Sequence, residues 1–406
     1  MDNLTHTLIG LVAGEAVSRS TRVDPAGLPA QTRRTTLLAI GMIGGNLPDS
    51  DLLWSMSSSG DKLGYLLEHR GYTHTLLGCV ALTALLYAAT LAWLQLRKQR
   101  PGGRDRWLLG LFALFAVLLH LGMDALNSYG VHPFWPWNNH WYYGDVLFIV
   151  EPLYWIAAAP LVFLMRSTAA RVLLALVLFI ASTAILVVHG FDWRWWSIPL
   201  LAWLLAMLGR RLQPWPASAT SVALMALATL GFAMASSVAS RRVEAAGREP
   251  AGYQTIDQVL SPSPAQPFCW DVLLLQRRGD EYVARRGQLN LIAAPECRSI
   301  LAGVGTAPMT PDLQQASHGM RWEGRFTTSL SRLAALADAS CATRALMQFA
   351  RAPFAAETPQ GWVLGDLRFD REKGLGMAEV LVAPRGAADC PHHAPWIGPR
   401  AELLQR

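Results

Sequence analysis

The chain has 406 residues, of which 52% are hydrophobic and only 16% are charged, whereas soluble domains carry about 25% charged residues. Together with 16 tryptophans and a positive mean hydropathy, this composition excludes an ordinary soluble enzyme and favours a membrane protein. The net charge of +6 comes mostly from arginines in short clusters between apolar runs, a pattern typical of membrane topology, so it argues against nucleic acid binding.

Apolar stretches dominate the first 240 residues. A helix needs about 20 residues to cross about 30 Å of hydrocarbon. Five stretches are this long, at 74–96, 107–126, 147–165, 171–189 and 217–240. Three weaker candidates are 4–18, 36–53, which Pro48 interrupts, and 195–209, which is short. The sequence therefore predicts an all-α polytopic membrane domain of about eight helices over residues 1–240.

Basic residues mark every second connection between these stretches. They are Arg19, Arg22, Arg33 and Arg34, then Arg97, Lys98, Arg100, Arg104 and Arg106, then Arg166 and Arg171, then Arg210 and Arg211. The alternate connections are rich in aromatic residues, as in HPFWPWNNHWYYGD, which suits an outer interface. The positive-inside rule then predicts that the N-terminus and the region after residue 240 lie outside.

The remaining chain has ordinary polarity and predicts a linker over 241–266 and a small α+β extramembrane domain over 267–406. FCWDVLLLQ and EYVARRGQLNLIA flank a polar turn, as GWVLGDLRF and GMAEVLVAP do, so two hairpins are expected. The stretch 327–351 has helical periodicity.

Four of the five cysteines fall in this tail. They are Cys269, Cys297, Cys341 and Cys390. An even number outside the membrane permits two disulfides in any of three pairings, and buried thiols in a cytoplasmic domain are the alternative.

Ten residues within the first 151 stand out as potential metal ligands. They are His6, Asp49, Asp51, His69, His74, His120, Asp124, His132, His140 and Glu151. The predicted topology brings most of them to one membrane depth, at the outer ends of the helices. Five ionisable residues at mid-bilayer would cost on the order of 12–18 kcal/mol on insertion scales. One or two divalent cations would neutralise the acids and use the imidazoles as ligands.

Local spacing gives each candidate a role and an alternative. His120 and Asp124 lie four residues apart, so one helix face can present both to a single ion, although a simple hydrogen bond between them is the alternative. Thr73 is expected to cap the third helix just before His74, and Thr5 repeats this arrangement before His6. Pro48 predicts a helix break that presents Asp49 and Asp51, and Asp51 is the more dispensable of the two.

Four further residues leave the choice open. Glu151 begins an apolar helix, where it could be a ligand, a general base or a carboxylate favoured by the helix dipole. Arg70 could hold a substrate anion or balance the acids. His132 and His140 lie in the aromatic loop, where a structural role is the more common one.

Four motifs occur in order: THTLIG, PDSD, HRGYTHTLLG and HLGMDALNSYGVHPFWPW. Over about residues 1–160 they resemble the YdjM-like family of bacterial inner-membrane metal-dependent hydrolases, here in a long form with an extra C-terminal domain. The resemblance implies a multi-pass protein of the inner (cell) membrane with a metal centre. It extends to His6, Asp49, Asp51, His69, His74, His120 and Asp124. Thr75 stands where many relatives have serine.

The sequence therefore predicts a metal-dependent hydrolase of the ester or phosphoester class, with one or two ions, zinc first and manganese or iron next. The expected ligands are His6, Asp49, His69, His74, His120 and Asp124, and the expected catalytic residues are Glu151, Arg70 and Asp51. The expected substrate is a phospholipid or another envelope ester at the outer membrane face. The alternative is a non-catalytic envelope protein with a structural metal site and a partner-binding C-terminal domain.

Overall fold

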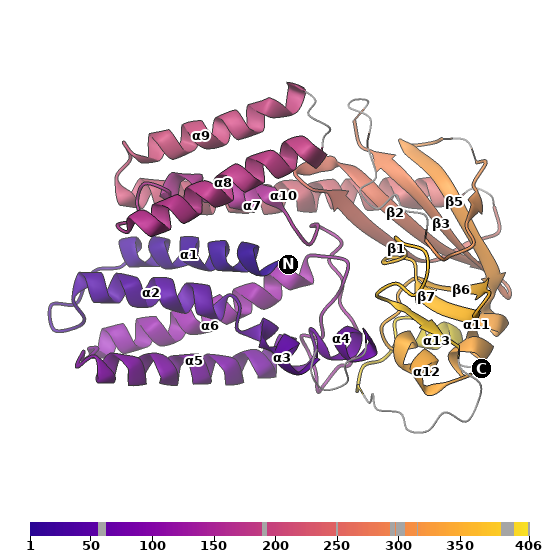
Figure 1. The fold of residues 1–406 in the computed structure, drawn as a ribbon, viewed down its shortest axis with the longest axis horizontal. Coiled ribbons are helices and arrows are strands. Elements are labelled where there is room, and N and C mark those ends of the chain that lie inside the picture. The colour runs from indigo at the N-terminus through magenta and orange to yellow at the C-terminus, as the bar shows by residue number, and fades with distance from the viewer. Residues whose placement is uncertain are drawn as a thin grey trace. The chain divides into compact units, whose positions relative to one another are not determined.

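A computed structural model describes residues 1–55, 62–188, 193–248, 251–292, 297, 305–314, 316–382 and 394–404. The chain divides into two compact units, both visible in Figure 1. The helical unit comprises Met1–Ser50, Thr73–Asn127 and Leu147–Phe232. The C-terminal unit comprises Asp51–Tyr72, Ser128–Val146 and Ala233–Arg406. As predicted, a mostly helical region precedes a domain built on β-sheets.

The helical unit begins with α1, α2, the short 3-10 helices η1 and η2, and the long helices α5 and α6. Their bounds are Asn3–Ser20, Ala30–Gly44, Pro48–Asp51, Tyr72–His74, Leu76–Leu96 and Gly103–Ala125. Then follow α7 (Pro152–Ala157), η3 (Ala159–Leu161), α8 (Thr168–Val188), η4 (Trp193–Trp196), α9 (Ser197–Gly209) and α10 (Pro214–Gly247). The last helix continues into the C-terminal unit.

Four of the described helices are long and apolar enough to cross a membrane. They are Leu76–Leu96, Gly103–Ala125, Thr168–Val187 and Pro214–Gly247. Three weaker candidates form the shorter helices α1, α2 and α9, and Pro48 does interrupt the predicted stretch 36–53. The expected count of about eight membrane helices is therefore not confirmed.

The predicted span 147–165 is wrong. Only Pro152–Ala157 is α-helical in this stretch, and a single 3-10 turn follows at Ala159–Leu161. Pro152 has no N–H and a fixed φ, which suits a first helical position, whereas Pro160 removes a helical hydrogen bond and ends the regular helix. Hydropathy alone overestimated this helix because the stretch is apolar and buried.

Glycines let α1 and α2 approach closely. A Cβ added to Gly10 would lie 2.0 Å from the carbonyl oxygen of Gly41, and one added to Gly41 would lie 2.1 Å from that of Gly10. A Cβ on Gly45 would likewise approach the carbonyl oxygen of His6 to 2.8 Å. This contact fixes the beginning of α1 beside the end of α2, where the candidate ligands lie.

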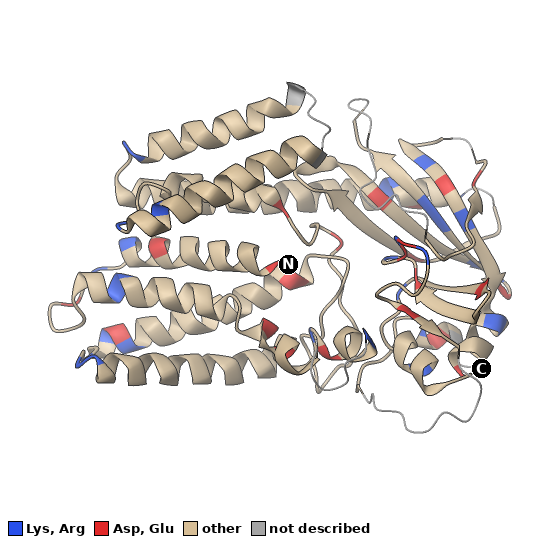
Figure 2. Cartoon of the chain, in the orientation of Figure 1, with Lys and Arg blue, Asp and Glu red and all other residues tan. Residues whose placement is uncertain are grey.

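The two ends of the helical unit differ in charge, as Figure 2 shows. Basic residues gather where α1 and α5 end and where α2 and α6 begin. At that end Arg34 Nε lies 2.7 Å from Glu15 Oε2, Arg19 Nε lies 2.9 Å from Glu15 Oε1, and Arg33 Nε lies 3.4 Å from Asp105 Oδ1. The opposite end carries the acids and histidines described below.

The C-terminal unit contains two antiparallel sheets, ordered β1-β2-β3-β5-β4 and β6-β7-β8. Their strands are β1 (Gln254–Ser263), β2 (Gln266–Arg278), β3 (Glu281–Asn290), β4 (Thr310–Pro311), β5 (Met320–Ser329), β6 (Pro353–Thr358), β7 (Gly361–Asp366) and β8 (Glu379–Leu381). The helices of this unit are α3 (Leu52–Ser55), α4 (Lys62–Glu68), α11 (Leu330–Ala337), α12 (Cys341–Met347) and α13 (Ala401–Leu404).

Side-chain alternation along β2 gives the larger sheet two apolar faces. Val272 and Leu274 pack with the end of α10, through Ala239 and Val243, whereas Leu273 and Leu275 face the core shared with α11 and α12. Both predicted hairpins are confirmed, since β2 pairs with β3 and β7 with β8.

Two predicted boundaries in the tail need correction. The range 241–266 is not a linker, because α10 runs to Gly247 and β1 occupies Gln254–Ser263. The predicted helix over 327–351 is two helices, because β5 extends to Ser329 and a capping box at Ser340 starts α12.

Three of the four tail cysteines, Cys269, Cys297 and Cys341, are disulfide-bonded. Cys269 and Cys297 are joined, with their Cα atoms 5.4 Å apart. Cys79 is a buried free thiol, and Cys390 lies outside the described residues.

Candidate metal centre

Asp49 reaches the site from the turn after α2. The helix ends at Gly44, and the 3-10 turn Pro48–Asp51 follows after the break that Pro48 predicted. Asp49 is 6% exposed. Burial alone would raise the pKa of its carboxyl group, but hydrogen bonding to His120 and His74 outweighs burial and holds this pKa below its ordinary value. Asp49 is therefore an anion at neutral pH.

His74 ends the 3-10 turn that precedes α5. Thr75 caps α5, because its side chain accepts a hydrogen bond from Gly78 N at 2.8 Å. The expectation that Thr73 would be the cap is therefore wrong, and Thr73 Oγ1 instead lies 3.0 Å from His74 Nδ1. Thr5 likewise is not the cap of α1, since Asp2 accepts from Thr5 N at 2.9 Å.

His120 and Asp124 lie one turn apart near the end of α6, and both are buried. His120 Nδ1 lies 2.7 Å from the carbonyl oxygen of Gly45. Since a carbonyl only accepts, Nδ1 donates, and the neutral imidazole then keeps its lone pair on Nε2. An imidazole that donates its other N–H to a backbone carbonyl in this way is the usual arrangement of a metal-binding histidine.

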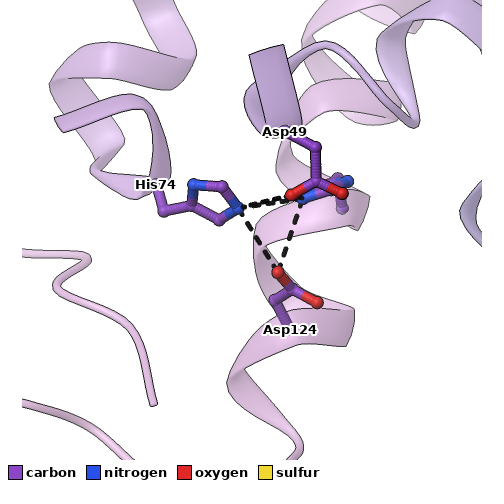
Figure 3. A group of neighbouring side chains, drawn as sticks. Asp49, His74 and Asp124 are labelled. Atoms are coloured by element: carbon purple, nitrogen blue, oxygen red, sulfur yellow. Dashed lines mark hydrogen bonds and ion pairs between the residues drawn. The ribbon is translucent and has the colours of Figure 1, made fainter. Parts of the chain in front are cut away.

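Four side chains from three parts of the chain converge. The nitrogens His74 Nε2 and His120 Nε2 are 3.0 Å apart. His74 Nε2 lies 3.4 Å from Asp49 Oδ1 and 3.3 Å from Asp124 Oδ2, and His120 Nε2 lies 3.5 Å from each of these oxygens. Figure 3 shows Asp49, His74 and Asp124 pointing toward one another. We call Asp49, His74, His120 and Asp124 the four-residue cluster.

The spacing of the cluster fits a cation. With metal–ligand bonds of about 2.0–2.1 Å, the ligand atoms of a tetrahedral zinc ion lie about 3.3–3.4 Å apart. All four residues can place a ligand atom within 4.8 Å of the others. Two buried carboxylates that meet imidazole nitrogens are costly without a positive charge, and a divalent ion supplies it. The donor set therefore suits a buried metal ion.

His6 lies beside the four-residue cluster. Its Nε2 is 3.2 Å from Asp124 Oδ1, the oxygen on the far side of the carboxylate, and its ring stacks on that of His120 at 3.8 Å. The amino group of Met1 also contacts Asp124 Oδ1. His6 is thus placed to orient Asp124 and His120.

Asp51, His69 and Arg70 contact one another within the C-terminal unit. Asp51 Oδ1 lies 3.0 Å from His69 Nδ1, and Asp51 Oδ2 accepts from Arg70 N at 2.9 Å. Arg70 has a left-handed backbone, with φ of 60°, and its guanidinium lies over the ring of Tyr129 at 4.8 Å. All three residues are buried.

The other predicted residues have local partners. Glu151 is buried and caps α7, since Oε1 accepts from Leu153 N at 3.0 Å. His132 packs between Trp141 and Trp396, with ring centroids 3.8 Å and 3.9 Å away. His140 is exposed and contacts Asn138. Sequence reasoning missed the Gly45 carbonyl and the role of Thr73 Oγ1, because no residue pattern marks a backbone oxygen or a shifted cap.

Comparison with known proteins agrees with the motifs of the N-terminal region. Residues 1–195 match the model of the YdjM inner membrane protein family, which confirms the predicted family for this region. The chain is also similar to the uncharacterized protein YfhP of Bacillus subtilis (strain 168), at 26% identity over 161 residues. That match covers 39% of this chain and 44% of YfhP. No solved structure matches the chain.

Proposed function

Taking the YdjM-type membrane region of residues 1–195 as the premise, we propose that the protein is a membrane-embedded, metal-dependent hydrolase of the ester or phosphoester class. One observation carries this proposal. Two imidazole nitrogens and two carboxylate oxygens from η1, η2 and α6 converge, and each nitrogen lies 3.0–3.5 Å from the other nitrogen and from both oxygens. Mixed nitrogen and oxygen ligands suit zinc, manganese or iron better than calcium or magnesium.

Asp49, His74, His120 and Asp124 would hold the ion. When bound, a divalent ion supplies Lewis acidity and lowers the pKa of a coordinated water to about 7. The Gly45 carbonyl and Thr73 Oγ1 fix the two imidazole rings, so little rearrangement accompanies binding. Four protein ligands fill a tetrahedron, so catalysis requires an ion that accepts a fifth or sixth ligand.

Asp51 remains a proposed catalytic residue. Its carboxylate lies 3.0 Å from His69 Nδ1 and would hold that imidazole in one tautomer. Glu151 keeps its predicted part as ligand or general base, and its carboxylate also caps α7 by accepting from Leu153 N. Arg70 remains the candidate for a substrate anion.

A phospholipid or another envelope ester is the proposed substrate, because the cluster lies at the ends of membrane-type helices. α6 ends with Asp124 and Ala125, and α5 begins two residues after His74. Basic residues occupy the opposite ends of the same helices (Figure 2), so the positive-inside rule orients the cluster toward the outer face of an inner membrane. On this topology we propose a multi-pass chain with a periplasmic C-terminal unit. Labelling of a cysteine introduced at exposed Lys98 or Asp338 in intact cells tests both sides.

The test of function begins with metal content. Full-length protein in detergent should carry about one zinc, manganese or iron ion per chain by elemental analysis, and His120→Gln should lose it. His140→Gln is the matched control, since His140 is exposed and outside the cluster. The loaded protein is then incubated with phosphodiester, phosphomonoester and acyl-ester lipids. Protein that binds no metal, or loaded protein that leaves every lipid class intact, contradicts the proposal.

A structural metal site is the second candidate, and the four-ligand set favours it because structural zinc sites are closed. The C-terminal unit would then bind a partner. The His120→Gln variant separates the two roles. A catalytic site predicts folded protein without turnover, whereas a structural site predicts loss of folded protein together with the metal.

A further inference from the structure

The C-terminal unit contains a cavity of about 520 Å³, a size typical of small-molecule sites. Its floor comes from β2, β3 and β5, through Gln276, Val283 and Arg325, and the segment after β4 forms its wall. Gln276 Nε2 donates to the carbonyl oxygen of Gly247 at 2.7 Å, which places the cavity next to the end of α10. We call it the sheet cavity.

Two arginines give the sheet cavity a positive charge. Arg285 and Arg325 are directly opposite each other on β3 and β5, an arrangement of like charges that destabilises a sheet unless anions lie nearby. Asp312 Oδ2 accepts from Arg285 Nε at 2.6 Å, and Arg325 lies 3.4 Å from Glu281. Only Asp312 among these acids lines the cavity, so its lining carries two cations and one anion.

Gln314 supplies the second feature. Its backbone N–H donates to Asp312 Oδ1 at 3.1 Å, which fixes the turn. Both polar atoms of its side-chain amide are buried, and neither has a hydrogen-bond partner in the described part of the chain. Each buried polar group without a partner costs about 1–3 kcal/mol, so an amide with two such atoms indicates a ligand that offers one donor and one acceptor.

Apolar surface completes the lining. Val283 is buried in the floor, Leu313 is 92% exposed at the mouth, and the ring of Tyr253 lies beside Arg325, whose Nη2 donates to Tyr253 Oη at 3.1 Å. A ligand with a short apolar side chain would cover Leu313 and Val283 while its polar groups reach the arginines and Gln314.

We propose that the sheet cavity binds a small peptide-like carboxylate, a molecule that carries a carboxylate, an amide group and an apolar side chain. The guanidinium groups of Arg285 and Arg325 attract the carboxylate, and guanidinium is the cation best matched to its two oxygens. Gln314 pairs with the amide N–H and C=O. The site is separate from the metal centre and does not depend on its activity.

The probe is N-acetyl-leucyl-alanine with a free carboxylate, titrated into full-length protein in detergent by calorimetry. Two analogues separate the contributions: the same dipeptide as its C-terminal amide, and hexanoate, which has the carboxylate without an amide. Binding of the dipeptide should be stronger than that of either analogue by about tenfold or more. Equal binding of all three compounds, or no binding of the dipeptide at roughly 10 mM, overturns the proposal.

Gln314→Leu should weaken dipeptide binding by about tenfold and leave hexanoate binding unchanged. Gln360→Leu, in the exposed turn between β6 and β7, is the matched control and should bind like the parent protein. Arg325→Gln should weaken both carboxylates but not the dipeptide amide. A Gln314→Leu variant that binds the dipeptide as well as the parent protein, with an unchanged melting temperature, also overturns the proposal.

Discussion

Acidic residues are buried at both ends of the bundle formed by α1, α2 and α6, but the residues that contact them differ between the two ends. At the basic end, Glu15 of α1 contacts Arg34 of α2 at 2.7 Å, and Asp105 of α6 contacts Arg33 at 3.4 Å. At the other end, Asp124 of α6 lies between imidazoles, 3.3 Å from His74 and 3.2 Å from His6. The helices and the burial are alike, and only the partners differ.

This difference separates a structural from a functional use of buried charge. A guanidinium is permanently charged, so at the basic end an arginine neutralises each buried carboxylate without any added ion. Imidazoles are neutral at most physiological pH values and offer lone pairs. At the other end, imidazole nitrogens and carboxylate oxygens therefore face one another, beside the Met1 amino group that contacts Asp124. The basic end therefore holds the helices together, and the cluster end is suited to bind a cation.

The largest expected effect is on metal affinity. Asp124→Asn keeps the shape of the side chain and removes one charged ligand, so affinity for zinc should fall about thousandfold, or about 4 kcal/mol. In metal-free protein the same change should also lower the free energy of unfolding, because Asp124 Oδ1 contacts the amino group of Met1 and lies 3.2 Å from His6 Nε2. Competition titration with a chelator measures the affinity. Asp338→Asn, an exposed site, is the control, and an equal loss there would show that the effect is not local.

The second effect tests the basic end. Glu15→Gln leaves Arg34 and Arg19 without their carboxylate, and the free energy of unfolding should fall by about 3 kcal/mol. Zinc content should stay the same. On α10, Glu244→Gln removes the exposed pair that Glu244 forms with Arg248, and it should change stability by less than about 0.5 kcal/mol. Loss of zinc in Glu15→Gln without loss of stability would reverse the comparison of the two ends.

A smaller effect is expected around the ligands. Thr73→Val removes the hydroxyl that lies 3.0 Å from His74 Nδ1, so zinc affinity should fall about tenfold while the four ligands remain. Thr90→Val is the control on α5, since Thr90 Oγ1 donates only within its own helix, to the Leu86 carbonyl. Equal zinc affinities of the two variants would mean that Thr73 does not orient His74.

Much of the candidate metal site could be predicted from the sequence, because ionisable residues are easily recognised within an apolar run. Periodicity placed His120 and Asp124 on one face, and Pro48 marked the break that presents Asp49. The structure brings these residues together with His74. His69 and Asp51, predicted for the same centre, contact each other in the C-terminal unit.

Other features of the site could not be predicted, because a sequence pattern does not decide between competing local structures. Thr73 and Thr75 are equally good caps, and the choice depends on where α5 begins after its 3-10 turn. Pro160 breaks an apolar run that hydropathy counts as one span. The Gly45 carbonyl that orients His120 is a backbone atom, so only the close packing of α1, α2 and α6 determines its partner.

In the C-terminal unit a carboxyl group, that of Glu379, is buried with neither an arginine nor a histidine beside it among the residues that the structure describes. The smallest expected effect, on the pH dependence of stability, concerns this residue. Glu379 is 3% exposed, and its Oε2 accepts from Thr306 Oγ1 at 3.0 Å and from Gly376 N at 3.1 Å. Burial, reinforced by the charge of nearby Asp370, raises the pKa of Glu379 to about 7 from its ordinary 4.5. A proton, rather than an arginine or a metal ion, then neutralises this group.

The sign of the pH dependence follows from that shift. The folded state binds this proton more tightly than the unfolded state, so the contribution to stability is complete below about 4.5 and is lost as the pH rises through about 7. With solvent screening, a loss of about 1 kcal/mol should lower the melting temperature of the unit by roughly 2–4 °C between these pH values. Glu379→Gln should remove this dependence, whereas Glu357→Gln at an exposed site should keep it. A parent protein whose melting temperature rises over the same range would show that Glu379 is ionised when folded, and the proton would then not be its partner.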